Sequence, residues 1–170
     1  MQYVGRKELR ETAAAVRELA LTYSTRAKGE LPVDRIFLGY VTGKHGKTRR
    51  QHPIRLQNKN KRIDFLIGGL KSGTYVELVL RKTGEEWRRG TNNSEMNKLV
   101  RVHGRMRALV IVDVTNRTPL TQERLKEEYV GWKSTRGRYK RRHITVVYAG
   151  ADGSYSFGLK TGKGGGLVED

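Results

Sequence analysis

The chain contains no cysteine, which excludes disulfide bonds and zinc sites built on thiolates. Its histidines, His45, His52, His103 and His143, show neither the helical pairing nor the carboxylate partners of a metal site. No apolar run approaches the about 20 residues that a membrane-spanning helix needs, and the first residues lack the apolar core of a signal peptide. We therefore expect a cytoplasmic protein with no structural zinc ion and no membrane partner.

Acidic residues are scarce: Asp and Glu number 17 against 35 Lys and Arg, a net charge of +18 over 170 residues. A surface adapted only for solubility mixes both signs, so this excess indicates a polyanionic partner. The length suits one domain, since single domains typically take about 100–200 residues. We expect one nucleic-acid-binding domain over residues 1–160, followed by a flexible glycine-rich tail over 161–170.

The hydrophobic pattern predicts an alternation of helices and strands. Apolar residues recur every three or four positions over 6–23, as in an amphipathic helix, and again in a helix over 94–104. Short apolar runs predict strands at 35–41, 63–67, 75–80 and 107–114, the second and third forming an antiparallel hairpin. A helix over 122–132 and a hairpin joining 144–149 to 155–159 follow. The pattern predicts an α/β fold with a mixed central sheet.

Two basic segments contain no acidic residue. The first, 43–62, includes glycines and a proline and is typical of a long exposed loop, and the second, 133–142, resembles it. A solvated charge run is the plainer alternative, but we expect binding to phosphates. The candidate nucleic-acid contacts are Lys44, Lys47, Arg49, Arg50, Arg55, Arg136, Arg138, Tyr139, Lys140, Arg141 and Arg142, with the Tyr139 ring stacking on bases.

Two carboxylates stand inside apolar strands. Strand alternation places Asp64 opposite the face of Ile63 and Phe65, and Glu77 on the face shared by Tyr75, Val79 and Arg81. Burying a carboxylate costs several kcal/mol of folding free energy unless the group is paired or metal-bound. Asp64 and Glu77 are therefore candidates for one shared site. The alternative is structural pairing, for example of Glu77 with Arg81.

The order helix, strand, strand, strand, helix, strand over residues 6–114, with Asp64 on the second strand and Glu77 on the third, resembles the PD-(D/E)XK nuclease-like superfamily. The resemblance implies an α-β-β-β-α-β sandwich core, with a C-terminal helix and hairpin added, and Asp64 and Glu77 as ligands of Mg²⁺ or Mn²⁺. Val79 stands where the family has lysine. The catalytic cation is then Arg81, or Lys98 with Glu95 beside it on the following helix.

We expect from these residues a magnesium-dependent endonuclease acting on DNA, a hydrolase of phosphodiester bonds. One alternative is an inactive DNA-binding module of the same fold, in which Val79 marks the lost chemistry. Another is a basic RNA-binding protein unrelated to nucleases. A homodimer is a further possibility that the sequence leaves open.

Overall fold

The computed structural model describes residues 4–26, 33–45, 47–56, 59–81, 92–115, 118–134, 139 and 142–170. Within these ranges the helices are α1 (Arg6–Arg26), α2 (Val33–His45), α3 (Asn93–Leu99) and α4 (Gln122–Tyr129). The strands are β1 (Thr48–Leu56), β2 (Lys59–Ile67), β3 (Thr74–Arg81), β4 (Met106–Asp113), β5 (His143–Gly150), β6 (Gly153–Thr161) and β7 (Leu167–Glu169). None of the helices in these ranges is long and apolar enough to cross a membrane.

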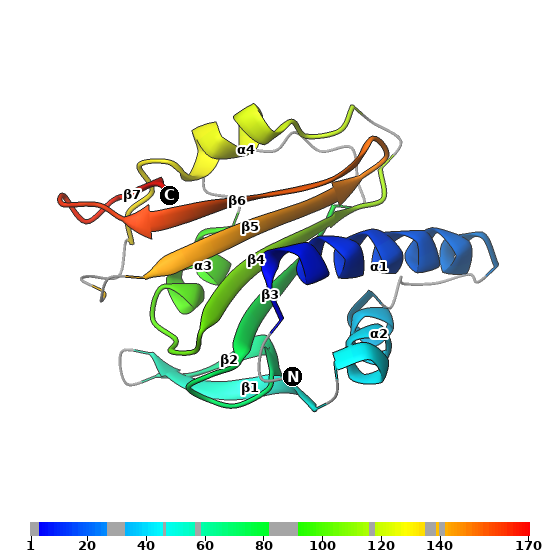
Figure 1. Cartoon of the computed structure of the whole chain (residues 1–170), viewed down its shortest axis with the longest axis horizontal. Coiled ribbons are helices and arrows are strands. Elements are labelled where there is room, and N and C mark those ends of the chain that lie inside the picture. Colours follow the sequence, from blue (N-terminus) through cyan, green and yellow to red (C-terminus); the bar gives the residue numbers. More distant parts are fainter. Residues whose placement is uncertain are drawn as a thin grey trace.

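The strands form one mixed seven-stranded sheet in the order β1-β2-β3-β4-β5-β6-β7 (Figure 1). Strands β1 to β3 are an antiparallel meander, β3, β4 and β5 run parallel, and β6 and β7 return antiparallel. The parallel steps need crossover connections, and these contain α3 and α4. The predicted α/β class with a mixed sheet is confirmed, as is the pairing of 63–67 with 75–80, for example Phe65 with Val76.

Helices cover both faces of the sheet. Residues Leu9, Ala13, Val16 and Ala20 of α1, spaced three or four apart, pack with α2 against one face. Residues Met96, Leu99 and Val100 of α3 and Leu125 and Tyr129 of α4 pack against the other face. The central strand β4 is buried almost throughout, which explains its near-continuous apolar sequence. The core is thus a helix–sheet–helix sandwich.

The predicted strand over 35–41 is wrong, because this segment lies in helix α2. Its fully buried residues are Phe37 and Val41, with Val33 almost as buried, and their spacing of four is that of one helical face. Partly buried apolar residues on either side widen this stripe into an unbroken run, which the sequence cannot distinguish from a buried strand.

The predicted exposed loop over 43–62 is also wrong, because it contains the end of α2 and the hairpin of β1 and β2. Strand β1 is the edge of the sheet, where basic side chains face water and discourage pairing with other chains. Pro53 stands within it, opposite Arg62 on β2, a position that an edge strand tolerates. The charges and the proline that suggested a loop therefore mark an edge strand.

The glycine-rich end of the chain, expected as a flexible tail over 161–170, turns back through Gly162–Gly166 and adds β7 to β6. Gly165 has a φ of +87°, which suits a residue without a Cβ.

Candidate active site

Asp64 and Glu77 lie where strands β2 and β3 separate. The ladder between these strands runs from the pair Ile67–Thr74 to the pair Phe65–Val76 and stops there. At the next step the Asp64 amide donates to Glu77 Oε1 (3.0 Å), and the Leu78 amide donates to Asp64 Oδ2 (2.8 Å). The two carboxylates therefore take the place of the missing backbone acceptors and are held beside each other.

Strand β1 is distorted at the same level. Gln51 has a φ of +53°, and no other non-glycine residue in the described ranges has a positive φ. It stands opposite Asp64, between the pairs Arg50–Phe65 and His52–Ile63, and its Nε2 lies 3.4 Å from Asp64 Oδ1. Such conformations cost about 1–3 kcal/mol and are frequent at functional sites. The sheet is strained where Asp64 is presented.

The distortion also reverses the alternation of β2. We predicted Ile63, Phe65 and Ile67 on one face, but Ile63 packs with Leu66 under α3, whereas Phe65 and Ile67 pack under α1 and α2. A regular period of two cannot continue through a residue whose backbone pairs are replaced by side chains.

Lys98 of α3 reaches the carboxylate pair. Its Nζ lies 3.0 Å from Glu77 Oε2 and donates to the Arg62 carbonyl at 3.1 Å. The Glu77 side chain is 2% exposed and that of Lys98 is 17% exposed, so the ion pair is largely buried and Lys98 is its more exposed partner. Val79, at the family's lysine position, packs in the core on the same face as Glu77. Of the two expected cations, Lys98 is the one beside Glu77.

The electrostatics of the pair disfavour its ionised form. Burial, and then the charge of Asp64, raise the pKa of Glu77 to about 7, against the opposing effect of Lys98. Burial raises the pKa of Asp64 as well, and the charges of Asp34 and Glu95 contribute in the same direction. Glu95 thus lies near the pair, as expected, although it is not a hydrogen-bonded member of it. A cation that approached the two carboxylates would stabilise their ionised forms, so the site favours a positively charged ligand.

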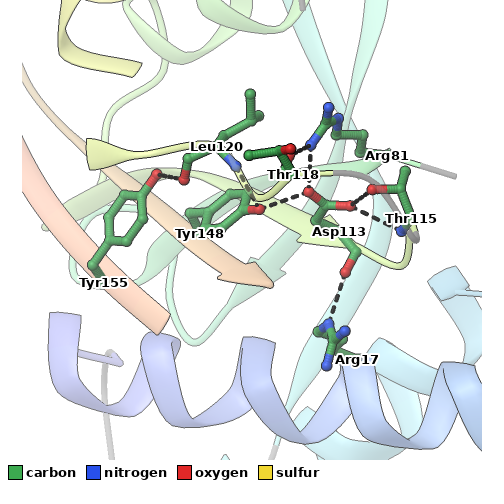
Figure 2. Close-up of polar contacts among 8 residues, drawn as sticks. All are labelled: Arg17, Arg81, Asp113, Thr115, Thr118, Leu120, Tyr148 and Tyr155. Carbon is green, nitrogen blue, oxygen red and sulfur yellow. Dashed lines mark hydrogen bonds and ion pairs between the residues drawn. The ribbon is translucent and has the colours of Figure 1, made fainter. Parts of the chain in front are cut away.

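Arg81, expected as a catalytic candidate or as the partner of Glu77, belongs to a different cluster (Figure 2). Its Nη1 lies 2.7 Å from Asp113 Oδ2 and donates to the Thr118 carbonyl. Although it shares a face with Glu77, it stands four residues further along β3, about 13 Å away at the usual rise of a strand. Arg81 is therefore removed from the candidate catalytic set.

Asp113 shows what a structural buried carboxylate looks like in this protein. It is 2% exposed and accepts hydrogen bonds from the Tyr148 hydroxyl (2.6 Å), the Thr115 hydroxyl (2.7 Å), the Thr115 amide and Arg81 (Figure 2). Burial alone would raise the pKa of Asp113, but these hydrogen bonds lower it below its usual value. Glu77 is buried and Asp64 is partly buried, and the pKa of each is shifted upward instead, which sets them apart from a structural ion pair.

The two carboxylates suit a magnesium or manganese ion whose coordination shell is completed by a substrate. Mg²⁺ is usually bound by one or two protein carboxylates together with phosphate oxygens and water. Asp64 and Glu77 supply two, and the lone pairs of each carboxylate exceed the contacts described above. Among the described residues there is no group of three or more His, Cys, Asp or Glu that could hold a metal by itself. The residues fit a transient ion better than a permanent structural one.

The first set of candidate nucleic-acid contacts lies on α2, on β1 and between them. The side chains of Lys44, Lys47, Arg49, Arg50 and Arg55 are exposed. Arg50 Nη2 lies 3.8 Å from Asp34 Oδ2 on α2. Arg50 immediately precedes Gln51, whose side chain contacts Asp64, so this arginine is the member of the set placed nearest to the carboxylate pair along β1.

In the second set, Arg136, Arg138, Lys140 and Arg141 lie outside the described residues. Tyr139 is half-buried, donates to the Gly165 carbonyl at 2.5 Å and packs against the Trp132 ring. These contacts leave less of its ring for stacking on a base. Arg142 is partly buried and donates to the Val102 carbonyl.

Sequence reasoning missed Asp34 and Gln51 as neighbours of Asp64. Asp34 directly precedes the segment 35–41 that we predicted as a strand, and its place in the first turn of α2 follows only when that segment is helical. Gln51 carries no local signal, because a positive φ at a residue other than glycine is imposed by the surrounding sheet.

No protein-family model matches the chain, and no characterised protein or solved structure matches it significantly.

Proposed function

We propose that this protein is a metal-dependent phosphodiesterase that cleaves nucleic acid, with DNA as the first candidate substrate. The observation that supports it most is the group Asp64, Glu77 and Lys98: two carboxylates with raised pKa values, fixed side by side at diverging strands, with an ammonium group 3.0 Å from one of them. Perturbed acids of this kind concentrate at catalytic sites.

The proposal assigns each side chain a task. Asp64 and Glu77 bind the divalent ion, which when bound polarises a phosphoryl oxygen and lowers the pKa of water. Lys98 supplies positive charge where negative charge develops on the phosphate. Gln51 and the Leu78 amide orient the two oxygens of Asp64. The same arrangement accounts for the resemblance to PD-(D/E)XK nucleases, with a lysine from α3 in place of one from β3.

The exposed cations on α2 and β1 supply the affinity. Contacts from arginine and lysine to phosphates position a nucleic acid without reading its sequence. A net charge of +18 adds a long-range attraction for any polyanion. The proposal therefore extends to the class of substrate and not to a target sequence.

Cleavage of plasmid DNA, single-stranded DNA and RNA with Mg²⁺ or Mn²⁺ tests the proposal. We expect metal-dependent cleavage by the wild type and a loss of at least about 100-fold in Glu77→Gln and in Lys98→Met. Glu127→Gln and Lys7→Met, at exposed positions on α4 and α1, serve as matched controls that remove one charge of each sign.

Each alternative outcome would indicate a different function for this protein. DNA binding without cleavage by the wild type would favour an inactive binding module. Preference for RNA over duplex DNA without cleavage would favour an RNA-binding protein. Equal cleavage by wild type and Glu77→Gln would contradict the assignment of the site.

A further inference from the structure

One buried charge in the described part of the chain forms no ion pair. The buried charged residues in the described part of the chain are Glu77, Arg107, Asp113 and Glu128. The three acids form ion pairs with Lys98, Arg81 and Arg124, whereas Arg107 is in none of the ion pairs described for these residues. Burying a charge without a counter-ion is costly. Arg107 therefore stands out as a cation without a resident anion.

The Arg107 guanidinium is held in place by backbone carbonyls. Its Nε donates to the His143 carbonyl (3.0 Å), and its Nη1 donates to the carbonyls of Gly104 (2.9 Å) and His103 (3.4 Å). These neutral acceptors fix the orientation of the group but leave its charge uncompensated. Burial, and then the charge of Arg142, lower the pKa of Arg107 to about 10, so it remains charged at neutral pH.

Arg107 lines a cavity of about 570 Å³ together with two other cations, Lys71 and Arg142. The lining residues among those described are Leu70, Lys71, Tyr75, His103, Gly104, Arg107 and Arg142, and none of these is acidic. The Tyr75 hydroxyl donates to the Leu70 carbonyl, which fixes one wall. A concave site with several cations and one buried guanidinium suits a phosphate group, for which arginine offers paired donors.

The cavity is adjacent to the candidate active site. Tyr75 precedes Glu77 by two residues on β3, on the same face of the sheet, which places it about 7 Å away along the strand. Arg107 pairs in register with Tyr75 from the neighbouring strand β4. A nucleic acid with one phosphate at Asp64 and Glu77 therefore has a neighbouring phosphate within reach of the cavity.

We propose that the Arg107 cavity binds a backbone phosphate of the nucleic acid next to the one that is cleaved. The inference rests on the proposed function for the identity of the ligand, but the phosphate site is testable without any catalysis. The buried guanidinium makes the main contact. Lys71 adds charge at the rim and the His103 ring adds a polar group, and both side chains are exposed.

The first experiment measures melting temperatures in sodium phosphate and in sodium chloride at equal ionic strength, without divalent metal. Because phosphate also stabilises folded proteins nonspecifically, wild type is compared with Arg107→Lys, which keeps the charge but loses the fork of donors. Lys7→Met on α1, at the opposite face of the sheet, is the control. We expect phosphate to stabilise wild type and Lys7→Met more than Arg107→Lys. Equal stabilisation of all three would overturn the proposal.

The second experiment measures the affinity for a short DNA duplex in EDTA, with Glu77→Gln as the background. Arg107→Lys should weaken binding about tenfold, and Lys71→Met, at an exposed position that tolerates substitution, should weaken it less. If Arg107→Lys does not fold, Lys71→Met replaces it in both the melting and the DNA-binding experiment.

The outcomes separate the two proposals. A phosphate effect without any change in duplex affinity would mean that the cavity takes free phosphate, which overturns the backbone assignment. Both effects present in a protein without nuclease activity would leave the phosphate site standing while the proposed function fails.

Discussion

At the scale of single residues, the protein contains two kinds of buried carboxylate. Asp113 accepts hydrogen bonds from four donor groups and has a lowered pKa, so its negative charge stabilises the fold. Glu77 lies beside another acid and has a pKa raised to about 7, so its negative charge destabilises the fold. The two positions should therefore respond in opposite ways to the loss of charge and to pH.

For Glu77 the sign follows from proton binding. Between its ordinary pKa of 4.5 and about 7, the folded state holds a proton that the unfolded state releases, so stability falls as pH rises through this range. Glu77→Gln removes this dependence. In urea denaturation without metal, we expect it to match wild type near pH 5 and to exceed it at pH 8, by at most about 3 kcal/mol.

Asp113→Asn is the matched comparison. It leaves Arg81 facing a neutral amide and should cost about 3–5 kcal/mol at both pH values, because one partner of a buried ion pair is lost. If Glu77→Gln were destabilising at both pH values as well, Glu77 would be a structural partner of Lys98 and the active-site assignment would fail.

At the scale of elements, the hairpin of β1 and β2 presents the site at a point where its own pairing is broken. Gln51 adopts a φ of +53°, and Asp64 opposite it bonds to β3 through side chains. The sheet thereby gives up regular backbone pairing at the position where carboxylates are displayed. Backbone strain of this kind persists only when the surrounding contacts hold the residue in its unfavourable conformation.

Replacing Gln51 tests this arrangement. Glycine adopts a positive φ without a Cβ penalty, so Gln51→Gly should leave thermal stability unchanged or raise it by about 0.5–1 kcal/mol. It should at the same time lower nuclease activity, because the amide that contacts Asp64 Oδ1 is lost. Gln51→Ala is the control, since it loses the same amide while keeping the strain. Full activity in both variants would show that Gln51 does not orient Asp64.

At the scale of the whole molecule, exposed positive charge lies along the edge strand β1, which also carries Gln51 to the candidate active site. The exposed arginines of β1 protect an edge strand from pairing and also border the carboxylate pair. The excess of 18 positive charges attracts polyanions in general, and under the proposed function the β1 cations determine where a nucleic acid binds.

The salt dependence of DNA binding measures this contribution. Each phosphate contact that is lost should reduce the slope of log K against log salt by about 0.9 for duplex DNA. We expect the triple variant Arg49→Gln, Arg50→Gln and Arg55→Gln to have a clearly smaller slope than wild type. Lys7→Gln on α1 should retain the wild-type slope. An unchanged slope in the triple variant would exclude β1 from the interface.

The sequence by itself determined the features that depend on local period and composition. The amphipathic spacing over Leu9–Ala20 identified α1, the continuous apolar run identified β4, and period-two alternation put Glu77 on the face shared with Tyr75 and Val79. The placement of Asp64 and Glu77 on neighbouring strands followed from a short glycine-rich turn, because a hairpin sets its own pairing.

Tertiary structure alone decided which cation joins the carboxylates. The sequence left both Lys98 and Arg81 as candidates, but strand rise carries Arg81 to Asp113, whereas the packing of α3 brings Lys98 Nζ to 3.0 Å from Glu77 Oε2. The same holds for α2, whose wide apolar stripe has no distinguishable period, and for β1, whose charges are tolerated only at an edge. Long-range packing sets these contacts, and no pattern within a few residues encodes it.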